Sequence, residues 1–237
     1  MENTLTLREK KILSPKLDVV FQALFGEVGS EKITTKFLEA ILQRKITSVD
    51  LSRNPILRRE YIDDKLGILD IVAKINGNEN CNIEMQFISQ DQLIERLLFY
   101  WSKLYSKQIK TGEDYDVLEK TIVILIANFE IAGLESLGYH TSWKIIEEKY
   151  RKTILTDKLE IRIIELPKII QLQNENDELL DWLFFLDNPQ CERVMLKMKN
   201  NKELKQANTK LEEISNNEHM QRIAEWRQKA ILEENTA

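Results

Sequence analysis

Alternating apolar and polar residues predict a β-hairpin over residues 67–87. Each half of this segment repeats with period two, as expected for strands that bury one face more than the other. Asn76-Gly77 lies between the two halves and favours a tight turn, because both residues tolerate positive φ. In the second strand Glu84 and Gln86 must share a face, since successive side chains point to opposite sides.

The length of the turn decides whether the acidic residues of the two strands meet. A two-residue turn would place Asp70 opposite Ile83 and send Glu84 to the other face. A three-residue turn over 76–78 would place Asp70 opposite Glu84. Any turn with an odd number of residues gathers Asp70, Glu84 and Gln86, whereas a one-residue slip separates them. We favour the odd turn.

An aspartate and a glutamate that meet across a hairpin repel each other, so stability does not explain their pairing. One interpretation is a solvated polar face. However, Ile68 and Val72 flank Asp70 on its own face, which indicates that this face is partly covered. Two partly buried carboxylates suit a hard cation such as Mg²⁺, which takes oxygen ligands and keeps several waters.

The remaining pattern predicts an α/β protein with a mixed sheet flanked by helices. A first helix starts at Ser14-Pro15 and ends at Gly26, and a capping-box spacing at residues 89–92 opens a long helix that ends near Gly112. Apolar periodicity gives a further helix over 30–43 and strands over 121–129, 142–150 and 159–166.

Beyond residue 171 the sequence becomes helical and rich in Lys, Glu and Asn, with few apolar positions. We therefore divide the chain into a core, residues 1–171, and a helical C-terminal extension, residues 172–237. Such an extension cannot fold alone, so it must pack on the core or on another subunit. The second case predicts a homo-oligomer held by the C-terminal helices.

Composition narrows the classes of function. The net charge of −5 over 237 residues argues against a nonspecific DNA-coating protein, although local basic segments exist. The candidates are residues 8–16, 58–59, 103–110 and 144–158. The two cysteines and two histidines stand apart, so neither a disulfide nor a zinc site is expected. With neither a membrane-spanning apolar stretch nor a secretion signal, we expect a cytoplasmic protein.

Several motifs in order resemble one known family. Asp70, thirteen residues and then Glu84-Met85-Gln86 are similar to the Asp…Glu-x-Lys signature of the PD-(D/E)xK nuclease superfamily, in a Glu-x-Gln variant. The accompanying stretches are residues 17–26, 63–70, 82–86, 100–105 and 164–167. Together they resemble the PD-(D/E)xK family transposases, also called recombination-promoting nucleases, over roughly residues 10–190.

This resemblance implies a restriction-endonuclease-like α/β fold and a DNA endonuclease that depends on Mg²⁺ or Mn²⁺. Asp70 and Glu84 would hold the metal with the Met85 carbonyl, and Gln86 would orient the attacking water. It also implies that Asp18 is an acidic residue near the active site. The sequence alone explains Asp18 equally well as a first-turn acid that favours the helix dipole.

One departure leaves an alternative open. Gln86 stands where the superfamily pattern has Lys, and an amide can hydrogen-bond but cannot supply a positive charge. The recombination-promoting branch commonly carries Gln here, so the change does not by itself imply an inactive enzyme. The alternative is a catalytically inactive nuclease-fold protein that binds DNA or another partner.

Overall fold

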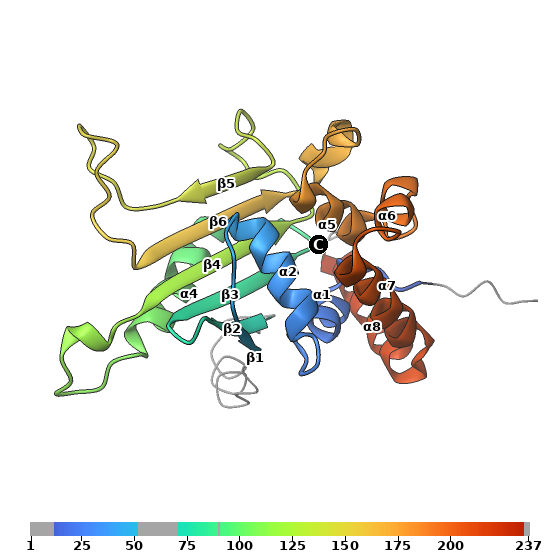
Figure 1. Ribbon diagram of the computed structural model, residues 1–237, viewed down its shortest axis with the longest axis horizontal. Coiled ribbons are helices and arrows are strands. Elements are labelled where there is room, and N and C mark those ends of the chain that lie inside the picture. The colour runs from blue at the N-terminus through green and yellow to red at the C-terminus, as the bar shows by residue number, and fades with distance from the viewer. Residues whose placement is uncertain (1–11, 52–70, 90, 235–237) are drawn as a thin grey trace, which may run out of the picture.

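The computed structural model describes residues 12–51, 71–89 and 91–234, and within these ranges a six-stranded mixed sheet forms the centre of the molecule (Figure 1). Its strand order is β1-β2-β3-β4-β6-β5. The strands are β1 (Val49–Leu51), β2 (Ile71–Ile75), β3 (Glu79–Gln86), β4 (Lys120–Ala127), β5 (His140–Trp143) and β6 (Leu159–Glu165). The predicted α/β class, with a mixed sheet between helices, is confirmed.

Strand direction changes across the sheet. β1, β2 and β3 are antiparallel, β3, β4 and β6 are parallel, and β5 returns antiparallel at the edge. β4 is buried along nearly its whole length, as expected for a central strand covered on both faces. The strands predicted over 121–129 and 159–166 are confirmed. The one predicted over 142–150 begins at His140 and already ends at Trp143.

The turn between β2 and β3 has three residues, so the prediction of an odd turn is confirmed. Ile75 pairs with Glu79, and Ile71 pairs with Ile83. Asn76 and Gly77 have φ values of 51° and 75°. The Asn76 Oδ1 accepts hydrogen bonds from the backbone N–H groups of Thr47 and Ser48, which ties the turn to the start of β1.

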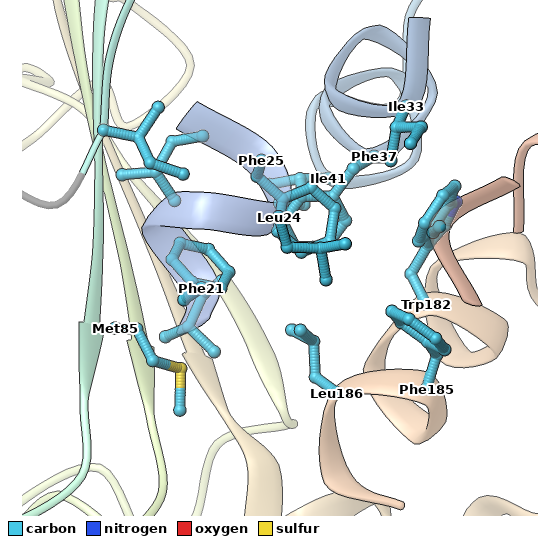
Figure 2. Close-up of a cluster of buried hydrophobic side chains, with 14 of the residues drawn as sticks. Phe21, Leu24, Phe25, Ile33, Phe37, Ile41, Met85, Trp182, Phe185 and Leu186 are labelled. Atoms are coloured by element: carbon cyan, nitrogen blue, oxygen red, sulfur yellow. The ribbon is translucent and has the colours of Figure 1, made fainter. Parts of the chain in front are cut away.

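Helices α1 (Asp18–Phe21) and α2 (Glu31–Leu42) lie in front of the sheet in Figure 1. α1 continues into a π-helical turn, Gln22–Gly26, which ends at the predicted glycine. The predicted start at Ser14-Pro15 is wrong, because Ser14 accepts the Leu17 N–H in a turn that precedes the helix. Aromatic rings fill this layer: Phe25 and Phe37 stack at 4.7 Å, and Trp182 lies 5.7 Å from Phe37 (Figure 2).

Helix α4 (Leu93–Ser106) covers the opposite face of the sheet and lies behind it in Figure 1. Its buried residues Leu93, Leu97, Tyr100 and Leu104 contact the apolar side chains of β4 and β6. The predicted capping box does not form, since no side chain caps the helix at Gln92. The helix also ends six residues before Gly112, which instead lies in a later turn.

The C-terminal helices pack on the α1/α2 side of the sheet. They are α5 (Glu178–Asp187), α6 (Glu192–Lys197), α7 (Lys202–Asn216) and α8 (Glu218–Glu234), and 3-10 helices lie at Tyr115–Val117 and Leu166–Leu172. Buried residues of α5, α7 and α8 join the same apolar core as α1 and α2. The extension therefore packs on the core, while its boundary after residue 171 and contacts between subunits stay predictions. Within the described ranges, every helix is too short or too polar to span a bilayer.

Candidate active site

The two faces of β3 have opposite character. Cys81, Ile83 and Met85 belong to the apolar core beneath α1 and α2, where Met85 lies beside Phe21 (Figure 2). Asn82, Glu84 and Gln86 alternate with them and therefore face α4. The register with β4 agrees, because Glu84 pairs with Leu125, which packs under α4. The expectation that Glu84 and Gln86 share a face is confirmed.

Three polar side chains of this face are joined by hydrogen bonds. The Asn82 Nδ2 donates to the Glu84 Oε1 at 3.0 Å, and the Gln86 side chain also hydrogen-bonds the Glu84 carboxyl group. Asn82 is fully buried and Glu84 is 3% exposed, whereas Gln86 is half-buried at the end of the strand. The carboxyl group is thus held between two amides of its own strand, of which Gln86 is the more exposed.

Burial raises the pKa of Glu84 to about 7. The ionised carboxylate loses hydration when α4 and the neighbouring strands cover it, so the neutral form is favoured. Hydrogen bonds from Asn82 and Gln86 and the positive charge of Arg96 act in the opposite direction and lower the pKa. Because burial outweighs these contributions, Glu84 is poised to exchange its proton near neutral pH.

Arg96 brings positive charge to this face from α4. Its Nη2 donates to the Tyr100 hydroxyl at 3.4 Å, and its guanidinium carbon lies 5.7 Å from the centre of the same ring. Tyr100 is only 1% exposed and so holds the arginine from a fixed position. The sequence did not single out Arg96, because a basic residue on an amphipathic helix looks like part of a solvated surface. Only the placement of α4 over β3 reveals its neighbour.

The oxygen atoms of this face fit a hard divalent cation. The Asn82 Oδ1 is buried and has no hydrogen-bond partner within the described residues, and the Glu84 carboxylate lies beside it. Carboxylate and amide oxygens are the ligands that Mg²⁺ and Mn²⁺ accept, whereas a buried oxygen without a partner is costly in an otherwise satisfied core. Asn82 is a residue that sequence reasoning missed, although its parity with Glu84 and Gln86 was visible.

The described residues supply only part of the predicted metal site. They contain no group of three or more Asp, Glu, His or Cys side chains that could bind an ion. Asp70, the second predicted carboxylate, lies outside the described residues. The side chain of Met85 belongs to the opposite core, so the predicted role concerns its backbone carbonyl alone.

Asp18 stands apart from this group. Its Oδ2 accepts a hydrogen bond from the Arg227 Nε of α8 at 2.7 Å, and its Oδ1 accepts the Val19 N–H at 2.8 Å. The buried residues of α1 lie in the core on the face of β3 opposite to Glu84. The structure therefore brings together Glu84 and Gln86, adds Asn82 and Arg96, and places Asp18 at the start of α1 in an ion pair. Its proposed place near the active site stays a prediction.

Comparison with known proteins extends this picture along the chain. The model of a protein family described as PD-(D/E)XK nuclease family transposase matches residues 15–237. The match includes the hairpin, α4 and also the C-terminal helices, which lie beyond the stretches that carried the resemblance in the sequence. Searches of curated proteins and of solved structures gave no match.

Proposed function

The chain belongs to the PD-(D/E)XK nuclease family transposases, and we propose that it is a metal-dependent endonuclease that hydrolyses phosphodiester bonds in DNA. The observation that best supports this proposal is the Glu84 carboxyl group, buried under α4 between Asn82 and Gln86. A sheet gains no stability from a buried acid with a raised pKa, so its placement points to chemistry.

Asp70 and Glu84 would hold Mg²⁺ or Mn²⁺, with the Met85 carbonyl as a third ligand. The described register ends with Ile71 opposite Ile83, and one further antiparallel pair would set residue 70 opposite Glu84. When bound, the cation lowers the pKa of a coordinated water and stabilises charge on a phosphate oxygen. Metal binding requires the ionised form of Glu84, so affinity should rise with pH through about 7.

Asn82, Gln86 and Arg96 would act by positioning other groups or by electrostatics, and none of them would gain or lose a proton. Asn82 fixes the Glu84 carboxyl group through its amide N–H. Gln86 is half-buried at the end of β3 and would orient water. Gln86 cannot supply the positive charge of a lysine. Arg96 brings such a charge from α4, and because an arginine stays protonated it stabilises negative charge without acting as a base.

Cleavage of supercoiled plasmid in Mg²⁺ tests the proposal. Loss of a metal ligand removes several kcal/mol of charge stabilisation, so Glu84→Gln and Asp70→Asn should each lower the rate by at least about 100-fold. EDTA should abolish cleavage by the wild-type protein. Met85→Leu is the matched control, because it changes the neighbouring side chain on the other face and keeps the carbonyl. Equal rates for Glu84→Gln and wild type would contradict the site.

A second candidate is a nuclease-fold protein that binds DNA or a partner without cutting. Gln86 in place of lysine favours it, as does the net charge of −5. Thermal unfolding in Mg²⁺ and Mn²⁺ separates the two functions. A metal that binds the folded protein at 100 times its Kd adds about 3 kcal/mol of stability. DNA binding with neither cleavage nor metal-dependent stabilisation would establish the second candidate.

A further inference from the structure

A hairpin between β5 and β6 projects from the sheet with nearly all of its side chains exposed. We call residues 144–158 the arm. Its two halves are joined by hydrogen bonds from the Glu147 N–H to the Thr153 carbonyl at 2.9 Å and from the Leu155 N–H to the Ile145 carbonyl at 3.0 Å. Figure 1 shows it extending beyond the end of the sheet at which β6 begins.

Both faces of the arm carry exposed apolar side chains. Ile146 and Ile154 pair on one face and are 46% and 47% exposed. Ile145 and Leu155 lie on the other and are 40% and 76% exposed. A two-stranded hairpin with water on both faces is at best marginally stable by itself. The arm therefore has the composition of a segment that is covered when a partner is bound.

The tip of the arm is basic. Residues 149–152 read Lys-Tyr-Arg-Lys, and within the described ranges Lys149, Arg151 and Lys152 form no ion pair with a carboxylate. The whole arm has five basic and three acidic side chains, a net charge of +2, whereas the chain has −5. Positive charge is thus concentrated on a segment that extends beyond the end of the sheet.

We propose that the arm is a second contact with duplex DNA, in which the tip cations bind phosphates and the apolar faces lie in a groove. This inference rests on the proposed function, because it concerns the same substrate. A two-stranded ribbon fits the major groove. Duplex DNA carries one charge per roughly 1.7 Å, a far denser target for three cations than the surface of a second copy of this acidic chain.

The position of the arm fits a duplex that also reaches the candidate site. Leu159 at the start of β6 aligns through β4 with Asn80, whereas Glu84 lies four residues further along β3. At about 3.3 Å per residue, those four residues and the length of the arm place the tip on the order of 30 Å from Glu84. That span is about one turn of duplex, so the arm would hold DNA away from the bond that is cut.

Fluorescence anisotropy with a 30-base-pair duplex in EDTA tests the arm apart from cleavage. The triple variant Lys149→Ala, Arg151→Ala, Lys152→Ala should weaken binding on the order of tenfold at 0.1 M salt. The salt dependence of log K should become shallower by about 3, one unit for each lost phosphate contact. All three residues are exposed, so the thermal unfolding temperature should not change.

The matched control is Lys199→Ala, Lys202→Ala, Lys205→Ala, which removes three exposed positive charges elsewhere. Unchanged DNA affinity in this control supports the proposal that the arm binds DNA. An equal loss of affinity in both triple variants overturns the proposal, because it shows a general effect of charge. Unchanged affinity in the arm variant overturns it as well. A lower mass in light scattering for the arm variant than for wild type would instead assign the arm to self-association.

Plasmid cleavage distinguishes failure of the arm from failure of the endonuclease. If wild type cuts DNA and the arm variant binds as well as wild type, the arm inference alone fails. If wild type binds through the arm but never cuts, the endonuclease fails and the arm stands. If wild type neither binds nor cuts, both fail.

Discussion

The two faces of the sheet differ in the side chains that they bury, and β3 shows this difference within a single strand. Toward α1 and α2 it presents Cys81, Ile83 and Met85 to a core of stacked aromatic rings. Toward α4 it presents Asn82, Glu84 and Gln86, of which the first two are as deeply buried as the apolar residues beside them. The residues of β3 on one face are apolar and pack in the core, whereas those on the other face are polar and surround a buried carboxyl group.

This difference shows how burial acquires a chemical meaning. On the aromatic face, removal from water stabilises the fold in proportion to the apolar area covered. On the α4 face, the same removal raises the pKa of Glu84 and leaves the Asn82 Oδ1 without a partner among the described residues. Burial on the α4 face is therefore unfavourable in free energy, and a bound cation would offset this cost. Three substitutions on β3 test this contrast.

Met85→Ala should have the largest effect, because it leaves a cavity in the aromatic face. Deleting a fully buried methionine side chain costs about 2–5 kcal/mol of unfolding free energy. Urea denaturation at pH 7 measures it, and Trp226→Ala is the control, since Trp226 is 84% exposed. A loss below about 1 kcal/mol would mean that this face is not close-packed.

Glu84→Gln should raise the free energy of unfolding, unlike Met85→Ala, and the increase should depend on pH. Glu84 keeps its proton in the folded protein to pH about 7, whereas its ordinary pKa is 4.5. The folded state therefore binds more protons in this window, and the unfolding free energy falls as the pH rises from about 4.5 to about 7. In EDTA, the variant should match wild type at pH 4 and exceed it by about 3 kcal/mol at pH 8.

Urea denaturation of both proteins across this pH range gives the difference directly. The sign is the decisive feature, because losing a merely structural hydrogen bond would destabilise the variant at every pH. A variant less stable than wild type at pH 8 would contradict the conclusion that burial outweighs the groups that stabilise the Glu84 carboxylate.

Asn82→Ala should have the smallest effect on stability and a clear effect on titration. It removes one hydrogen bond to Glu84, worth about 1 kcal/mol, together with a buried oxygen that has no partner in the part of the chain that the structure describes. Because the Asn82 hydrogen bond lowers the pKa of Glu84, the pKa should move further up in the variant. NMR of the Glu84 carboxyl carbon measures it, and a downward shift would contradict the role of Asn82.

Much of this architecture followed from periodicity. The period-two pattern of the hairpin predicted the shared face of Glu84 and Gln86, and the turn has the odd length that we favoured. The continuous apolar run of β4 predicted a central strand. These features are local or depend on one parity, so a single sequence is sufficient to state them.

Other features depended on tertiary contacts that periodicity does not encode. Asn82 was missed because an asparagine on a strand usually faces water, and only the crossover helix between parallel β3 and β4 buries it. The strand expected to reach residue 150 ends at Trp143, since the following residues leave the sheet and pair within the arm. The capping-box spacing at residues 89–92 failed because Gln92 takes a left-handed conformation.

The three-residue turn at 76–78 limits how this protein can change in length. β3 is fixed by its ladder with β4, so an added or deleted turn residue would have to be absorbed by β2. A change of one residue would exchange the side chains that β2 presents to its two faces. Ile71, Ala73 and Ile75 would then turn from the aromatic layer toward α4. A change of two would leave both sets in place, so insertions and deletions at this turn are expected to survive in pairs.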